Sequence, residues 1–178
     1  MKALVNRIIH TSVVDGPGNR AAIFLQGCNY TCSYCHNPET IHRCVHCGVC
    51  VPVCPTGALT MELDKVVWRE EKCCKCDQCL AACPNMASAK VREYSASEVM
   101  ALLKNDLPFI RGITVSGGEC SLQRDFLLEL FTLAKKKKLT CLMDSNGSYD
   151  YTADAELMAV CDGVMLDVKA RGDGLHRK

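Results

Sequence analysis

The chain has almost no excess of charge of either sign and no long apolar run. Its 21 Lys and Arg residues against 20 Asp and Glu residues give a formal net charge of +1, which is too small to predict binding to nucleic acid or to an anionic membrane surface. No run of about 18 apolar residues occurs, and residues 1–5 do not open a signal peptide. We therefore expect a cytoplasmic protein that spans no membrane and binds no nucleic acid.

Cysteine, in contrast, is abundant. The 178 residues include 15 cysteines, and an odd number in a chain without a secretion signal does not indicate a disulfide framework. Most of the cysteines are separated by only two or three residues, a spacing typical of metal ligands. The composition therefore predicts metal centres rather than disulfides.

Eight of the cysteines form two matching runs within residues 41–90. Each run reads Cys-x2-Cys-x2-Cys-x3-Cys-Pro, and the second repeats the first after 29 residues. This is the bacterial ferredoxin spacing, in which the fourth cysteine of each run binds the cluster of the other run. The predicted ligands are Cys44, Cys47, Cys50 and Cys83 for one 4Fe-4S cluster, and Cys73, Cys76, Cys79 and Cys54 for a second. A pair of zinc sites is the alternative, but it leaves the third cysteine and the Cys-Pro ending of each run unexplained.

A third group has a different spacing. Cys28, Cys32 and Cys35 follow an apolar run at residues 21–26 as Cys-x3-Cys-x2-Cys. Three thiolates can bind three irons of a 4Fe-4S cluster and leave the fourth iron open to a substrate, as a catalytic zinc ion keeps one open position. The alternative is a structural site that a distant cysteine completes. The unassigned cysteines are Cys74, Cys120, Cys141 and Cys161.

Outside the two runs, strand and helix signals alternate, which predicts an α/β fold with a parallel sheet. Strands are predicted over residues 21–26, 112–116, 140–144 and 164–168. Helices are predicted after a capping box at residues 95–98, over residues 127–134 and around residues 154–160. A hairpin of residues 58–61 and 65–68 is predicted between the two cysteine runs. In parallel sheets, functional residues gather at the carboxyl ends of the strands.

Two motifs resemble those of the radical S-adenosylmethionine (SAM) superfamily. Residues 28–35, Cys-Asn-Tyr-Thr-Cys-Ser-Tyr-Cys, resemble its cluster-binding signature, and Gly117-Gly118-Glu119 resembles its Gly-Gly-Glu motif after the second strand. The resemblance implies that the open iron chelates the amino and carboxylate groups of SAM. It also implies that the Gly-Gly-Glu motif contacts the methionyl amino group.

The resemblance narrows to the glycyl-radical-enzyme activating enzymes, and within them to a YjjW-like subgroup. The motifs that carry it are residues 15–20 (Asp-Gly-Pro-Gly-Asn-Arg), 35–38 (Cys-His-Asn-Pro), 144–147 (Asp-Ser-Asn-Gly) and 165–169 (Met-Leu-Asp-Val-Lys). It implies a partial TIM-like (β/α) barrel, with about four of six units, and an inserted ferredoxin-like domain with two 4Fe-4S clusters. The implied domains are residues 1–40 (first part of the core), 41–90 (insert) and 91–178 (rest of the core). Because the last units lack a counterpart, we expect a fragment or a half-barrel.

The resemblance also implies the site residues. Cys28, Cys32 and Cys35 would be the catalytic cluster ligands. The implied SAM contacts are Tyr34, Cys35, His36, Gly117, Gly118, Glu119, Asp144, Ser145, Asp167, Val168 and Lys169. The pyruvate formate-lyase type of the family further implies a monovalent cation at Asp144, Ser145, Met165 and Asp167.

The activity that the resemblance implies is that of an oxidoreductase. It would reductively cleave SAM to a 5'-deoxyadenosyl radical and remove a hydrogen atom from a glycine of a partner glycyl radical enzyme, with flavodoxin or ferredoxin as electron donor. One alternative is a radical SAM enzyme that acts on a small molecule. The other is a noncatalytic iron-sulfur electron carrier, which would complete the third cysteine set.

Overall fold

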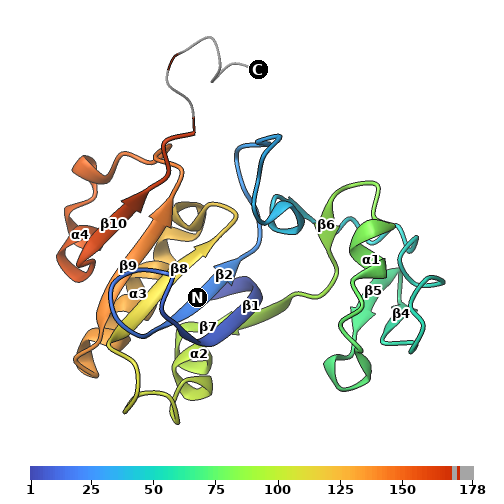
Figure 1. Cartoon of the computed structure of the whole chain (residues 1–178), viewed down its shortest axis with the longest axis horizontal. Helices are drawn as coiled ribbons and strands as arrows, with labels where there is room; N and C mark the ends of the chain where they lie inside the picture. Colours follow the sequence, from blue (N-terminus) through green and yellow to red (C-terminus); the bar gives the residue numbers. More distant parts are fainter. Residues whose placement is uncertain (170–171, 173–178) are drawn as a thin grey trace.

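A computed structural model of the chain describes residues 1–169 and 172 (Figure 1). Its main element is a six-stranded sheet with the order β10-β9-β8-β2-β1-β7. The strands are β1 (Lys2–Ser12), β2 (Arg20–Leu25), β7 (Arg92–Ser95), β8 (Gly112–Gly117), β9 (Thr140–Ser145) and β10 (Gly163–Leu166). β2, β8, β9 and β10 run parallel to one another. The predicted α/β class with a parallel sheet is therefore confirmed.

The other edge of the sheet is antiparallel, which the sequence did not indicate. β1 pairs antiparallel with both β2 and β7. Its pairing with β2 shifts register twice, between Val5 and Arg7 and between Ile9 and Ser12. Such irregularities interrupt the alternation of apolar and polar residues by which a strand is recognised in a sequence.

Three helices pack against the sheet, as predicted (Figure 1). They are α2 (Ala96–Leu102), α3 (Arg124–Lys136) and α4 (Ala155–Val160). α2 begins with the predicted capping box, in which Ser95 and Glu98 each accept a hydrogen bond from the backbone N–H of the other. The helices and the strands between them bury one continuous apolar core, which includes Ile23, Val115 and Phe131.

The opposite face of the parallel strands carries Phe24 and Leu142 together with small and polar residues. Ala22 and Thr114 are neighbours in register there, and Ser116 follows Thr114 on the same face. A loop before β2 covers part of this face, where Thr114 Oγ1 donates to the backbone carbonyl of Asp15 over 2.6 Å. Gly16 in this loop has φ +111°, and a Cβ there would lie 2.8 Å from Leu142 Cδ1. The loop therefore needs glycine at this position.

Arg20, at the start of β2, is completely buried. Its guanidinium donates to the hydroxyl oxygens of Thr114 (2.8 Å) and Thr140 (2.9 Å). It also donates to the backbone carbonyl oxygens of Pro17, Ile113 and Thr140. Burial lowers the pKa of Arg20. This side chain ties the amino ends of three neighbouring strands together.

Residues 41–90, here called the cysteine-rich segment, lie beside the sheet (Figure 1). β3 (His42–Arg43) and β6 (Ala87–Ser88) pair in parallel where the segment leaves and rejoins the rest of the chain. The predicted hairpin is confirmed as β4 (Leu59–Glu62) and β5 (Lys65–Trp68). The segment also contains the short helix α1 (Gln78–Ala81) and a 3-10 turn, η2 (Glu70–Lys72).

Three further 3-10 turns lie outside that segment: η1 (Pro38–Thr40), η3 (Cys120–Gln123) and η4 (Tyr151–Ala153). η1 follows the Cys28, Cys32 and Cys35 loop, and η3 follows the Gly-Gly-Glu motif. Within residues 1–169 and 172, no helix has the length and apolar character needed to cross a membrane.

Candidate iron-sulfur and cofactor site

The carboxyl ends of the four parallel strands bring distant parts of the sequence together. The Cys28 loop follows β2, Glu119 follows β8, Asn146 follows β9 and Lys169 follows β10. Because the strands are parallel, these residues share one edge of the sheet. Hydrogen bonds between the loops, described below, connect them.

The loop with Cys28, Cys32 and Cys35 is closed by backbone hydrogen bonds. Cys28 N donates to Ile41 O over 2.8 Å, and Cys35 N donates to Cys32 O over 3.1 Å. The Cys28 sulfur accepts from the backbone N–H of Tyr30 at 3.4 Å. Burial raises the pKa of the Cys28 thiol. N–H donors around a sulfur stabilise the thiolate that a metal site requires.

Asn146 connects this loop to β9. Its side-chain amide donates to the Cys28 sulfur over 3.8 Å and to Asn29 Oδ1 over 2.9 Å. The sequence motif contained Asn146, but only Asp144 and Ser145 were assigned a role there. Its position directly after a strand was the signal that could have identified it.

Both glycines of the Gly-Gly-Glu motif are required by close approach of the backbone. A Cβ on Gly117 would lie 2.2 Å from Leu25 O, and one on Gly118 would lie 2.1 Å from Gly27 O. Glu119 N donates to Gly27 O over 2.8 Å. The glycines therefore allow the end of β8 to pack against the start of the cysteine loop.

Glu119 is fully buried. Its carboxylate accepts from Ser121 N (3.1 Å) and Ser121 Oγ (2.6 Å). It also accepts from Ser145 Oγ (3.0 Å) and from Asn146 N (2.8 Å). In this structure the carboxylate joins the ends of β8 and β9. Its contact with the amino group of SAM stays a prediction.

The polar residues at β9 and β10 lie beside the cysteine loop. Asp144 accepts from Ser116 Oγ over 2.8 Å, and burial raises the pKa of Asp144. Lys169 Nζ donates to Asp167 over 2.5 Å. Burial lowers the pKa of Lys169, but Asp167 and the nearby Cys32 and Asp144 raise it more.

The remaining predicted SAM contacts differ in exposure: Tyr34 is exposed, whereas Ser145 is buried. The Tyr34 hydroxyl donates to the backbone carbonyl of Lys169, which joins the cysteine loop to the segment after β10. His36 and Val168 are exposed. Ser145 Oγ already accepts from Tyr151 and donates to Glu119.

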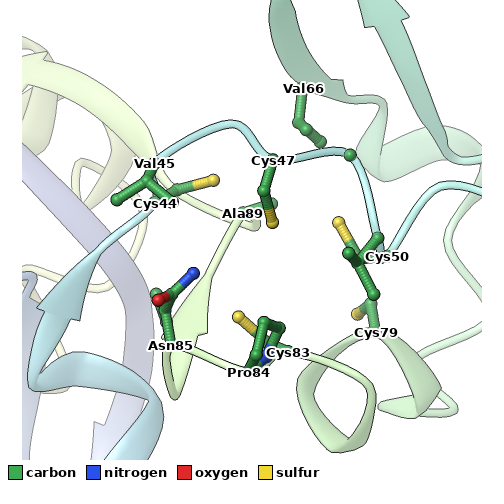
Figure 2. Close-up of a pocket in the computed structure, with 13 residues that line it drawn as sticks. Cys44, Val45, Cys47, Cys50, Val66, Cys79, Cys83, Pro84, Asn85 and Ala89 are labelled. Carbon is green, nitrogen blue, oxygen red and sulfur yellow. The ribbon is translucent and has the colours of Figure 1, made fainter.

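The first cysteine cavity lies in the cysteine-rich segment (Figure 2). The cysteines predicted to hold the first cluster line it, and Figure 2 shows their sulfur atoms directed toward the same space. These residues are Cys44, Cys47, Cys50 and Cys83. Cys79 also borders this cavity. The structure thus brings two cysteines of the second run, Cys79 and Cys83, to three of the first.

The second cysteine cavity combines the two runs in the opposite way, with one cysteine of the first run and three of the second. Its lining includes the four cysteines predicted for the second cluster, Cys54, Cys73, Cys76 and Cys79, together with the unassigned Cys74. Burial raises the pKa of the Cys54 thiol, but the backbone N–H groups of Leu59 and Thr56 donate to it and lower the pKa overall. Five cysteines line each cavity, and in each they include the four predicted ligands, which is the donor set of a 4Fe-4S cluster.

Zinc requires a more compact arrangement, with every sulfur about 2.3 Å from one ion. Among residues 1–169 and 172, no group of three or more His, Cys, Asp or Glu side chains is arranged to hold a single metal ion. The zinc alternative stays untested.

Three unassigned cysteines have thiols that donate to backbone carbonyl groups. Cys120 Sγ donates to Asp144 O over 3.4 Å, and Cys161 Sγ donates to Gly163 O over 3.2 Å. Cys141 is buried, and burial raises the pKa of its thiol to about 12. Burial also raises the pKa of Cys120 and Cys161. Completion of the Cys28 loop by one of these cysteines stays an untested alternative.

Comparison with known proteins agrees with this geometry. The 4Fe-4S single cluster domain family matches residues 14–176. The choline trimethylamine-lyase activating enzyme of Oleidesulfovibrio alaskensis is 31% identical over 98% of this chain and 62% of its own length. The chain belongs to the radical SAM activating-enzyme family. The pyruvate formate-lyase-activating enzyme of Streptococcus mutans is 33% identical over 98% of this chain and 53% of its own length.

The chain spans about half to three fifths of the length of the curated relatives that it matches. The crystal structure of QueE from Escherichia coli has a similar fold, with a TM-score of 0.57 over 84% of this chain and 54% of that one. At 18% identity, this likeness concerns the fold alone. The family expected from the sequence is confirmed, and the YjjW-like subgroup stays a prediction.

Proposed function

We propose that this chain carries the SAM-cleaving site of an enzyme that activates a glycyl radical enzyme. The observation that carries the proposal is the gathering of the three-cysteine loop, the Gly-Gly-Glu motif and the polar ends of β9 and β10 at one sheet edge. The relatives named as activating enzymes support the reaction class.

The proposed cluster at this edge uses Cys28, Cys32 and Cys35 and leaves one iron open. The arrangement fits because the three cysteines share one loop, and two N–H groups donate to the Cys28 sulfur. When bound, the cluster and SAM would supply reductive cleavage of SAM and a 5'-deoxyadenosyl radical that takes a hydrogen atom from a glycine of the partner protein.

The chain's own contribution would be to hold and orient SAM. We assign this to the SAM-contact residues predicted from the sequence. Among them, Tyr34 belongs to the cysteine loop, and Lys169 lies close to both Cys32 and Asp144. Glu119 would in addition position the site, because its carboxylate holds the start of η3 and the loop after β9. The monovalent cation site stays a prediction.

We further propose that the sheet is the first part of a (β/α) barrel and that residues 41–90 are a ferredoxin-like domain with two 4Fe-4S clusters. The two reciprocal cysteine cavities support this assignment. The domain would deliver electrons from a flavodoxin or ferredoxin to the SAM site. Action on a small molecule remains the second candidate.

The test is anaerobic reconstitution with iron and sulfide, followed by reduction with SAM and candidate partner proteins. We expect 5'-deoxyadenosine by chromatography and a glycyl doublet by electron paramagnetic resonance (EPR). Cys32→Ala should abolish both products, whereas Ser33→Ala, an exposed neighbour, should retain them. Undiminished 5'-deoxyadenosine from the Cys32→Ala variant would show that the site lies elsewhere. Cleavage of SAM without a glycyl signal with any partner, but with turnover of a small molecule, would favour the second candidate.

A further inference from the structure

The second cysteine cavity contains one thiol more than a 4Fe-4S cluster needs. Cys74 lines it together with the four proposed ligands of the second cluster. Cys74 is not part of the repeat, and no role follows for it from the proposed function. It is exposed, as is Cys76.

The backbone brings Cys74 close to one ligand in particular. Lys75, between the two cysteines, has φ +57°, a left-handed conformation that curls the chain. Cys74 and Cys76 both line the second cysteine cavity, separated by this one residue. Cys74 therefore lies beside the cavity, next to the ligand that it could replace.

We propose that Cys74 is a reserve ligand of the second cluster, which binds the iron of Cys76 when Cys76 is not available. The proposal rests on the cluster assignment but not on SAM chemistry. The exchange breaks one Fe–S bond and forms another. The Cys74 thiol releases a proton, the departing Cys76 thiolate takes one up, and the iron keeps its oxidation state.

The internal repeat supplies a matched control. Cys47 holds in the first run the place that Cys76 holds in the second, and both are exposed. The residue two positions before Cys47 is Val45, where the second run has Cys74. The first cavity thus has no reserve thiol beside Cys47. Loss of Cys47 and loss of Cys76 should have different consequences.

The experiment measures bound iron, acid-labile sulfide and EPR spectra of anaerobically reconstituted full-length chains. The wild type should bind about twelve irons, as should Cys76→Ala and Cys74→Ala. The double variant Cys74→Ala/Cys76→Ala and the control Cys47→Ala should each lose a cluster, or convert one to a 3Fe-4S form with its own signal in the oxidised protein. Circular dichroism would show that all variants retain the fold of the sheet.

Two results would overturn the proposal while leaving the ferredoxin-like assignment in place. In one, Cys76→Ala loses as much iron as the double variant. In the other, the double variant keeps its full iron content. A wild-type chain with only about four irons would overturn the ferredoxin-like assignment together with this proposal. None of these results depends on SAM cleavage, so a failure here is distinct from a failure of the proposed activity.

Discussion

The sheet with its helices and the cysteine-rich segment are held together in different ways. The sheet buries a continuous apolar core, in which the strands contribute Ile23 and Val115 and the helices contribute Leu130 and Phe131. The cysteine-rich segment has a separate hydrophobic cluster, in which three residues are buried: Cys50, Leu59 and Val66. So small a cluster is insufficient to stabilise about fifty residues by burial alone.

The two regions also differ in backbone conformation. Among the described residues, all non-glycine residues with positive φ except Lys138 lie in the cysteine-rich segment. They are His46, Leu63, Asp64, Lys75, Asp77 and Met86. Such conformations are unfavourable unless surrounding structure enforces them. The comparison teaches that hydrophobic burial stabilises the sheet but not the segment, and we expect the proposed iron–sulfur clusters to stabilise the segment instead.

The largest expected effect is that of removing iron. Chelation under anaerobic conditions should abolish protection of backbone amides in residues 41–90, because the bonds that enforce their conformation are lost. Amides of β2, β8 and β9 should stay protected, since their core contains no metal ligand. Hydrogen exchange followed by mass spectrometry measures both regions in one sample. Equal loss of protection in both would refute the comparison.

Truncation of the sheet's core should have the next largest effect. Phe131 on α3 is completely buried in this core, and Phe131→Ala should lower the free energy of unfolding by about 3–5 kcal/mol. Urea unfolding followed by far-ultraviolet circular dichroism measures it. The matched control is Leu59→Ala in the cysteine-rich segment, which should leave the unfolding midpoint of the sheet unchanged. A shared shift would mean that the two regions unfold as one unit.

Arg20 tests how much buried hydrogen bonds contribute to the stability of the sheet. Arg20→Met removes a buried guanidinium and leaves the Thr114 and Thr140 hydroxyls and several carbonyls without their donor. We expect a loss of at least about 3 kcal/mol in the free energy of unfolding. Arg111→Met, at an exposed neighbouring position, should change it by less than about 0.5 kcal/mol. The same urea titration compares the two variants, and similar small effects would contradict the role of Arg20.

A smaller, pH-dependent effect should arise at α4. The Arg124 guanidinium, with Tyr149, holds the pKa of Asp154 well below its usual range. A carboxyl group whose pKa is lower in the folded state adds stability above its unfolded pKa of about 3.9. That contribution is lost as the pH falls toward the folded pKa. Asp154→Asn should therefore flatten the stability profile below about pH 4, and an unchanged slope in urea titrations across this range would contradict the assignment.

Regular elements of the fold were predictable because their signals are local. The capping box at Ser95 marks the start of α2, and periodic apolar residues mark α3. The four parallel strands were visible as short apolar runs. β1 was not, because two register shifts break its alternation. β7 was missed together with its partner, since the pairing of edge strands depends on distant contacts.

The candidate site was predictable in its residue types and its sheet edge. Cysteine spacing and strand-end positions were enough for that. Two hydrogen bonds of Asn146 were not predictable, namely the one from its backbone N–H to the Glu119 carboxylate and the one from its side chain to the Cys28 sulfur. Both depend on how the loops after β8 and β9 meet in space. Spacing alone also could not show that Cys74 borders the second cavity.

The central claim is that the Cys28 loop holds a cluster with an open iron to which SAM binds. It is tested most directly by EPR of the reduced, reconstituted protein with and without SAM, compared between the wild type and Cys32→Ala. The account predicts that SAM changes the signal of one cluster in the wild type. It also predicts that the variant keeps the signals of the two other clusters and shows no response to SAM. A wild type with about twelve irons that does not respond to SAM, or a variant that responds as the wild type does, would contradict it.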